Sequence, residues 1–401
     1  MNSFIQNTKN TFKNLKKMRI GIEGQRLFRQ NKHGMDLVVL ELIRNLQRID
    51  TENEYFIFVS PDEDDTCLKE SPNFKIVKLE GKFYPYWEQI SLPGAAKKYA
   101  CDLLHCTSNT APIHCSIPLI ITLHDIIYLE SLSLFRKGFT SYQRFGNLYR
   151  RLVIPHALKK SKKIITVSDF EKERINDFFK KHDDGHIVTV YNGVNDYFKP
   201  IYDDNILSEV KKKYRLPDNY FFYMGNTDPK KNTRNVLIAY ADFIHINGPT
   251  QELVMLDYEK EKLKALLNAI NAPELMHHIH LTGYVTNNDL PAIYNQSDLF
   301  LYPSLRESFG IPILEAMACG IPVITSNTSS MPEVAGGAAI LIDPYNPNEL
   351  TNAIEQLLSD HKLRLKLRKA GFIQAAQFSW QKMAEKVLEI YKGVLNGKSN
   401  G

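Results

Sequence analysis

Short apolar runs alternate with segments of helical period along most of this chain, and that alternation limits its fold more than any other feature. A run such as Tyr55–Val59 is typical of a buried strand, whereas the apolar residues between Leu37 and Leu46 repeat with the period of a helix. Strands that alternate with helices form a parallel sheet covered on both faces, so the sequence predicts an α/β protein. The expected strands are Arg19–Ile22, Tyr55–Val59, Phe74–Leu79, Asp102–His105, Leu119–Leu123, Ile164–Val167, Ile187–Tyr191, Phe221–Met224, Leu253–Leu256, Ile279–Leu281, Leu299–Tyr302, Val323–Ser326 and Ala339–Ile342.

These strands fall into two sets, and 401 residues exceed the ~250–300 at which a single core stops growing. We therefore expect two domains, 18–198 and 199–379, connected through Asn195–Tyr214. A last helix over 380–396 starts after Ser379 as its N-cap. Residues 1–17 are expected to form a flexible basic extension, for which a weak amphipathic helix and a misassigned start before Met18 stay open. Ligands of open parallel sheets bind beyond the carboxyl ends of the strands, which places the active site between the lobes.

Charge and composition exclude several classes of protein. The net charge of +5 neither requires nucleic acid nor rules out an anionic surface, and we expect no nucleic-acid partner. No apolar run reaches the ~18 residues that span a bilayer. Five scattered cysteines are typical of reduced thiols in the cytoplasm. His105-Cys106 and His114-Cys115 match no standard zinc spacing, so no metal site is expected.

The segment Pro303–Gly320 joins a strand to a helix in a way that predicts an anion site. Pro312 suits the first turn of a helix, and Gly320 suits the left-handed residue just past its end. The unpaired N–H groups at the start of that helix, near Phe309 and Gly310, face outward at the carboxyl end of the strand. Such a helix end binds phosphate readily.

Two carboxylates flank this anion site, Glu307 in the loop and Glu315 about one turn into the helix. Carboxylates accept paired hydrogen bonds from vicinal hydroxyls, so the arrangement suits a sugar nucleotide, with one Glu on the donor sugar and the other on the ribose. The alternative is that Glu307 is a solvated loop residue and that Glu315 only favours the helix dipole, by ~0.3–1 kcal/mol.

The run from Glu307-Ser308-Phe309-Gly310 through Glu315 to Ile324, followed by Ser330–Gly336, resembles the signature of retaining glycosyltransferases of family 4. The resemblance covers nearly the whole chain after Met18. It implies a GT-B fold, in which two Rossmann-like domains face each other across a cleft, with an acceptor domain first and a nucleotide-sugar donor domain second. It also implies that the last helix crosses back onto the first domain. Ser308 stands where the family usually has glycine.

The resemblance extends to other segments that would contact the donor. Lys230 and Lys231 lie at a helix start, which Asn232 would cap, and match the family's basic pair for the leaving diphosphate, although Asn226 replaces its usual arginine. His124 follows a strand in the motif that contacts the donor sugar; alone, it would more often be a histidine bonded to Asp125. The expected catalytic residues are Glu307, His124 and Lys231, and the expected donor-binding residues are Gly34, Lys230, Lys231, Tyr284, Val285, Ser308, Phe309, Gly310, Ile311 and Glu315.

Gly34 lies where the family has a glycine-rich loop over the donor phosphates, although Met35-Asp36 departs from its usual glycine and arginine. A plain turn with Asp36 as the N-cap of the next helix is the competing interpretation. Tyr284-Val285 resembles the stretch whose backbone contacts the nucleotide base.

The expected activity is transfer of a hexose of mannose or glucose type from a nucleoside-diphosphate sugar to a carbohydrate or lipid-linked glycan in polysaccharide biosynthesis. No cofactor is expected beyond the donor itself. We expect a reaction that survives a chelator, with retention by same-face attack. A nucleotide-sugar epimerase and a non-catalytic nucleotide-sugar-binding subunit are the alternatives. The basic run over 144–163 is usually a solvated helix face, and its alternative role is peripheral contact with an anionic membrane.

Overall fold

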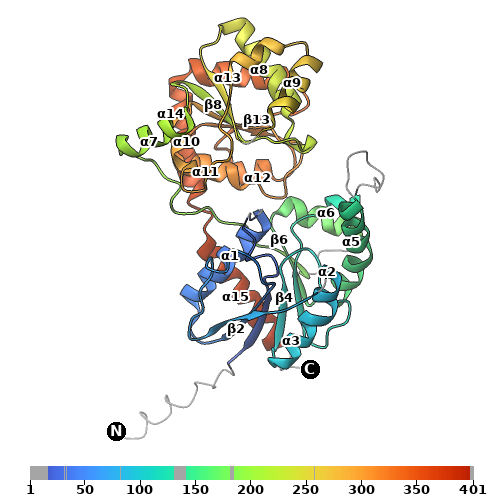
Figure 1. Cartoon of the computed structure of the whole chain (residues 1–401). Helices are drawn as coiled ribbons and strands as arrows, with labels where there is room; N and C mark the ends of the chain where they lie inside the picture. The colour runs from blue at the N-terminus through green and yellow to red at the C-terminus, as the bar shows by residue number, and fades with distance from the viewer. Residues whose placement is uncertain are drawn as a thin grey trace, which may run out of the picture. The chain divides into compact units, whose positions relative to one another are not determined.

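The computed structural model describes residues 17–30, 32, 34–81, 83–130, 141–180, 185–256 and 258–397, and the side chains of 141–144 are not described. The expected extension 1–17 therefore lies, apart from Lys17, outside the described residues. The chain divides into two compact units (Figure 1). Unit 1 comprises residues 1–165, 181–188 and 384–401, and unit 2 comprises 166–180 and 189–383.

Unit 1 is built on a 7-stranded sheet of order β3-β2-β1-β4-β5-β6-β7. The last residues of β6 and β7, Thr166 and Thr189, are assigned to unit 2. Strand β1 runs parallel to both β2 and β4, which places it inside the sheet. The strands are β1 (Arg19–Glu23), β2 (Glu54–Val59), β3 (Phe74–Lys78), β4 (Leu103–Cys106), β5 (Leu119–Thr122), β6 (Lys163–Thr166) and β7 (Ile187–Thr189).

Helices lie in most of the connections between these parallel strands, whereas β2 to β3 and β4 to β5 are joined by loops. One connection contains a five-residue π-helix, η1, a rare element that marks functional sites in many proteins. The helical segments are α1 (Gly34–Ile49), α2 (Tyr84–Tyr86), η1 (Trp87–Ser91), α3 (Leu92–Lys98), α4 (Ile127–Glu130), α5 (Ser141–Lys160) and α6 (Asp169–Phe179).

Unit 2 is built on a 6-stranded sheet of order β10-β9-β8-β11-β12-β13. Successive side chains of a strand point to opposite faces, so Phe222 and Phe300 pack into one core and Phe221 and Leu301 into another. The strands are β8 (Tyr220–Tyr223), β9 (Glu252–Met255), β10 (Ile279–Leu281), β11 (Leu299–Tyr302), β12 (Val323–Ser326) and β13 (Ile340–Ile342).

Helices cover both faces of this sheet, with α10, α11 and α12 on the first core and α8, α9 and α13 on the second (Figure 1). The helical segments of the second half are α7 (Asp204–Tyr214), η2 (Pro229–Lys231), α8 (Thr233–Asn247), α9 (Lys260–Ala269), η3 (Pro273–His277), α10 (Leu290–Gln296), α11 (Ile311–Cys319), α12 (Met331–Ala335), α13 (Pro347–Ser359), α14 (His361–Ala375) and α15 (Trp380–Asn396).

The predicted fold is confirmed, because each predicted strand exists within two residues of its expected ends. Ser379 caps α15 as predicted, accepting a hydrogen bond from the N–H of Lys382 at 3.1 Å. Most of α15 belongs to unit 1, where the Tyr391 hydroxyl lies 2.6 Å from Nδ1 of His105. The units differ from the expected boundary at 198 and 199, since α6 and residues 189–198 belong to unit 2.

The alternative cap at Asp36 is wrong, and Asn232 occupies its expected N-cap position without a side-chain cap hydrogen bond. Helix α1 begins at Gly34, so Asp36 lies inside its first turn and is buried. Asn232 does precede α8, but its side chain makes no cap hydrogen bond. Its Nδ2 donates instead to the carbonyls of Pro303 at 3.0 Å and Pro344 at 2.7 Å. The side chain of Asn232 thus ties three loops of unit 2 together rather than closing one helix.

No helix within the described ranges is long and apolar enough to cross a membrane. All five cysteines are unpaired thiols, in agreement with the prediction.

Candidate active site

The predicted loop between β11 and α11 is present, and its end is shaped by Gly310. This residue has φ of 100° and ψ of 49° at the N-cap of α11, a conformation open mainly to glycine. Pro312 lies in the first turn and Gly320, with φ of 80°, ends the helix, both as predicted. Helix α11 therefore starts directly beyond the carboxyl end of the central strand β11.

Hydroxyl groups from the last residue of β12 and from the segment after it donate hydrogen bonds to the carbonyls of this loop. Ser326 Oγ donates to the carbonyl of Ser304 at 2.6 Å, and Ser329 Oγ donates to that of Glu307 at 2.6 Å. Ser330 Oγ reaches the carbonyls of both Glu307 and Phe309 at 2.9 Å. The hydroxyls thereby satisfy buried carbonyls that no secondary structure pairs.

The N–H groups at the start of α11 are left for a ligand. Across the described parts of the chain, those of Phe309, Gly310 and Ile311 have no protein acceptor. The Phe309 ring is buried against Phe378, with 5.7 Å between the ring centroids. Only the backbone of Phe309 is therefore left to contact a ligand. Unpaired N–H groups at the positive end of a helix dipole form an anion site.

An ion pair lies beside this anion site. Lys231 Nζ is 2.6 Å from Glu307 Oε1 and 2.9 Å from the hydroxyl of Tyr302, and both charged side chains are almost buried. Burial acts to raise the pKa of Glu307, but Lys231 and Lys230 outweigh it and hold that pKa below its usual value. Glu307 is therefore an ionised, fixed carboxylate rather than the solvated loop residue of the alternative interpretation.

Lys230 is positioned by the backbone around η2. Its carbonyl accepts from the N–H of Leu305 at 2.7 Å, and its own N–H donates to Asp228 Oδ1 at 3.1 Å. Within the described residues its ammonium group forms no ion pair of 4.0 Å or less. Lys230 thus remains available to a phosphate, whereas Lys231 is already paired with Glu307.

Glu315 lies on α11 in a dry environment. Its Oε2 accepts a hydrogen bond from the hydroxyl of Tyr294 at 3.1 Å. Burial raises the pKa of Glu315 to about 7, and the Tyr294 hydrogen bond lowers it only in part. Burial, and then the charges of Glu307 and Glu315, raise the pKa of Tyr302, so both carboxylates act on this one phenol.

The expected base-binding residues form a loop after β10. Gly283 has φ of 69°, Tyr284 is 69% exposed, and Val285 packs against the first core of unit 2. The exposed ring offers a stacking surface as well as the backbone contacts expected from the sequence.

His124 of unit 1 follows β5 as predicted, but its partner is not Asp125. Its Nε2 lies 3.0 Å from the carbonyl of Thr107, so Nε2 carries the proton and Nδ1 is the acceptor. Its backbone N–H donates to Asn109 Oδ1 at 2.6 Å. Burial lowers the pKa of His124, which keeps the ring neutral at pH 7. The exposed Gly34 begins α1, and a methyl group added there would meet nothing within 4 Å.

The alternative metal interpretation of His105 finds no support. Its Nδ1 faces the Tyr391 hydroxyl at 2.6 Å and its Nε2 faces Thr122 Oγ1 at 2.8 Å, so both ring nitrogens have protein partners. In the described portion of the chain, no three His, Cys, Asp or Glu side chains gather as a metal site would require.

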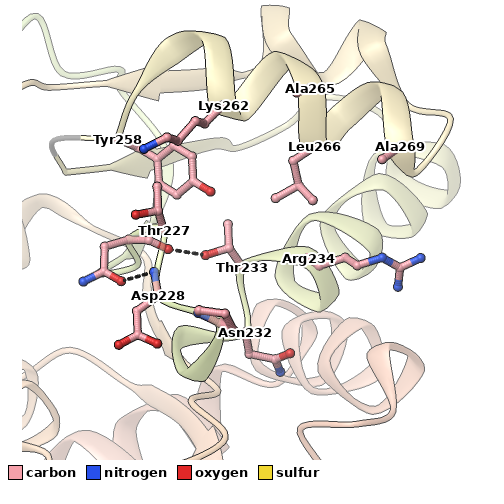
Figure 2. A pocket seen from close by; sticks show the side chains of 12 residues that line it. Thr227, Asp228, Asn232, Thr233, Arg234, Tyr258, Lys262, Ala265, Leu266 and Ala269 are labelled. Atoms are coloured by element: carbon pink, nitrogen blue, oxygen red, sulfur yellow. Dashed lines mark hydrogen bonds between the residues drawn. The ribbon is translucent and has the colours of Figure 1, made fainter. Parts of the chain in front are cut away.

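A separate pocket of about 500 Å³ is lined in part by residues that flank η2 (Figure 2). Thr227 and Asp228 line it from the β8–α8 connection, and Tyr258, Lys262 and Leu266 line it from the region of α9. None of the predicted donor-binding residues lines this pocket. One side of the pocket is nevertheless formed by residues 226–229, the segment that leads into Lys230 and Lys231.

The sequence interpretation gave no role to Ser326, Ser329, Arg306 or Glu171, all of which hold the site. A signal existed for the first two, since Thr325–Ser330 is rich in hydroxyls directly after a strand. No local signal identifies the others, because their partners lie far away in the sequence.

Two family models match the chain. The model for glycosyl transferases group 1 matches residues 207–374, and the model for glycosyltransferase family 4 matches residues 33–197. Together they cover most of both units.

Two curated relatives of the chain are mannosyltransferases of Escherichia coli. The O-antigen chain mannosyltransferase B of Escherichia coli is 34% identical over 245 residues, which are 61% of this chain and 64% of that protein. The serotype-specific mannosyltransferase WbdA of the same organism is 30% identical over 213 residues, 52% of this chain and 26% of that protein. The match thus spans less than two thirds of each relative.

Among solved structures, the sucrose-phosphate synthase of Thermosynechococcus elongatus superposes with a TM-score of 0.72. The superposition covers 95% of this chain and 100% of that protein at 18% sequence identity, and it confirms the predicted fold alone.

Proposed function

The chain belongs to the group 1 and family 4 glycosyltransferases, and from that premise we propose that it transfers a hexose from a nucleoside-diphosphate sugar to a glycan acceptor in polysaccharide biosynthesis. Transfer of mannose is favoured over glucose, because both relatives described above are named mannosyltransferases. Carbohydrate and lipid-linked glycans are the proposed acceptors.

The observation that carries this proposal is the Lys231–Glu307 pair of 2.6 Å beside three N–H groups that have no acceptor among the described residues. Departure of a nucleoside diphosphate builds negative charge, and fixed donors placed where the charge develops are a large source of rate enhancement. Lys231, Lys230 and the start of α11 bind the diphosphate. Glu307 holds hydroxyls of the donor sugar, and Glu315 holds the ribose.

The stereochemical course we propose is retention by attack on the same face from which the diphosphate leaves. The paired, ionised Glu307 is a ligand of the sugar in this scheme rather than a nucleophile. Neutral His124 contributes a hydrogen bond to the donor sugar from unit 1.

The test is nucleotide release from UDP-, GDP- and ADP-sugars, measured for the unaltered protein, for Glu307→Gln and for Glu274→Gln. Glu274 is an exposed carboxylate and serves as the matched control. We expect release from one donor, lost in Glu307→Gln and kept in Glu274→Gln. Equal release from all three proteins would remove Glu307 from the mechanism. Ring epimerisation without acceptor would favour the epimerase, and nucleotide binding without turnover would favour a binding subunit.

We also propose peripheral contact with an anionic membrane through α5. Phe145, Leu148 and Leu152 are 58%, 47% and 61% exposed, and their spacing places them on one helix face. Exposed Lys159 lies on the same helix, and exposed Lys162 lies two residues beyond the end of that helix. Apolar side chains beside basic ones are typical of interfacial helices.

Flotation with vesicles of phosphatidylglycerol or phosphatidylcholine tests this contact. We expect binding to the anionic vesicles only, lost when Phe145, Leu148 and Leu152 are all changed to serine. Serine at Ile246 and Ile373, which are 63% and 69% exposed elsewhere, is the matched control and should leave binding intact. Equal flotation of both variants would remove α5 from the contact.

A further inference from the structure

Helix α6 contacts the loop that carries Glu307 at the two residues on either side of it. Arg306 Nη2 lies 3.0 Å from Glu171 Oε1 and 3.2 Å from Oε2, both on α6. On the other side, Ser168 Oγ donates to the carbonyl of Ser308 at 2.7 Å. The chain thus enters and leaves Glu307 through residues held by one helix.

The Arg306–Glu171 pair is buried. The Glu171 side chain has no exposed surface and that of Arg306 is 18% exposed. The guanidinium also lies over the ring of Phe170, 4.5 Å from its centroid. Taking two charges out of water costs several kcal/mol per ion, and replacing a buried pair with apolar residues is often neutral or stabilising. Stability alone therefore does not account for this pair.

The N-terminus of α6 is itself fixed from two sides. Ser168 is its N-cap and accepts from the N–H of Glu171 at 3.2 Å. Glu333 of α12 accepts from the N–H groups of Asp169 at 3.1 Å and Phe170 at 3.3 Å. The N-terminus of α6, which contacts the loop, is therefore held in place both by its own cap and by α12.

We propose that Arg306 and Glu171 are positioning residues, which fix the backbone of Glu307 and Ser308 so that Glu307 and the N–H groups that follow it keep the geometry that the donor requires. The inference rests on the proposed function. A misplacement of about 1 Å can reduce a rate by about 100-fold, which makes such support functionally valuable.

The test separates positioning from stability with three variants. Arg306→Met removes the guanidinium that neutralises the buried Glu171 carboxylate, so both melting temperature and kcat should fall. Arg306→Met combined with Glu171→Leu removes both charges, so the melting temperature should recover. Leu357→Ala, in the opposite core of unit 2, lowers stability without touching the loop and is the matched control.

We expect the double variant to keep a kcat about 100-fold below that of the unaltered protein despite its recovered stability, with little change in KM for the acceptor. The kcat of Arg306→Lys should lie between that of the double variant and that of the unaltered protein. Leu357→Ala should lose stability and keep kcat. Recovery of kcat together with melting temperature in the double variant would overturn the proposal, because the pair would then be merely structural.

Amide hydrogen exchange over 303–310 tests the same inference without any turnover. The double variant should exchange at least about tenfold faster in this segment, while exchange in β11 and β12 stays unchanged. Unchanged exchange over 303–310 would also overturn the proposal. If the unaltered protein uses no donor, the proposed function fails, and the exchange measurement still decides whether α6 orders the loop.

Discussion

At the scale of single residues, the main feature of the site is an ion pair between two side chains, Lys231 and Glu307, that neutralise each other in the absence of a ligand. Lys231 pairs with Glu307, while Lys230 stays unpaired within the described residues. In the proposed function, a bound diphosphate would share Lys231 with Glu307, so the lysine would link the leaving group to the carboxylate proposed to hold the donor sugar. The two lysines are adjacent in sequence and differ in role.

Replacing Lys231 with methionine should reduce kcat by about 10²–10³, the usual effect of losing one fixed donor to developing charge. Stability should also fall, because Glu307 would remain buried without its partner. Steady-state kinetics and thermal melting measure the two effects. Lys264→Met, an exposed site on α9, is the control. A Lys231→Met protein with unchanged kcat would show that Lys230 and the helix suffice.

Glu315 should make stability depend on pH. Its pKa in the folded protein is about 7, raised by burial, so the folded state holds this proton more tightly than the unfolded state does. Its contribution to stability is therefore present at low pH and is lost as pH rises from about 4.5 through 7. Glu315→Gln should melt close to the unaltered protein at pH 5 and above it at pH 8. Parallel melting curves across this range would contradict the assignment.

At the scale of elements, the site depends on the start of α11 and on the segment after β12. Helix α11 supplies N–H groups, and the serines after β12 bind the loop carbonyls. Gly310 is the residue that makes the turn between loop and helix possible.

Gly310→Ala should lower the free energy of unfolding by about 1–2 kcal/mol, because a side chain at positive φ is strained. Nucleotide affinity should fall as well, since the N–H groups after residue 310 would turn. Urea unfolding and titration calorimetry measure the two quantities. Gly94→Ala, inside α3 with nothing within 4 Å of the new methyl, should instead raise stability by about 0.5–1 kcal/mol. A neutral Gly310→Ala would mean that the turn tolerates a side chain.

The same elements predict that no divalent ion is needed. In the proposed function, Lys230, Lys231 and the N-terminus of α11 would supply positive charge to the diphosphate. Transfer measured in excess EDTA should match transfer in magnesium within about twofold. The remaining difference should be small because dissolved ions screen interactions between partly buried charges only weakly. Turnover lost in EDTA and restored by a divalent ion would refute this prediction.

At the scale of the whole molecule, α15 links the two units of the chain. Residues 380–383 belong to unit 2 and the remainder to unit 1, where Tyr391 is fully buried against His105. His105 in turn contacts Thr122 at the end of β5, the strand that leads to His124. The chain's last helix thus completes the core of its first sheet.

Tyr391→Phe should destabilise unit 1 by about 1–3 kcal/mol, because His105 would keep a buried ring nitrogen without a partner. Urea unfolding measures the change, and Tyr345→Phe, at a tyrosine that is 67% exposed, is the control. Equal unfolding midpoints for the two variants would contradict the role of the His105–Tyr391 hydrogen bond.

The sequence by itself determined the strands, the helix ends at Pro312 and Gly320, and the positions of Glu307 and Glu315 around a helix start. These features are local, since the period of apolar residues and the backbone limits of proline and glycine act within a few residues. The family signature is local as well, which is why the fold was predictable.

Only the tertiary structure decided which groups meet. Lys231 and Glu307 are 76 positions apart, and Arg306 and Glu171 are 135 positions apart. A local pattern fixes the direction of a side chain but not its partner on another element. Asn232 lies at its expected N-cap position, but its side chain bonds distant carbonyls instead of the helix, and the alternative cap at Asp36 fails because α1 starts earlier. The raised pKa of Glu315 likewise follows from burial, which exists only once the chain has folded.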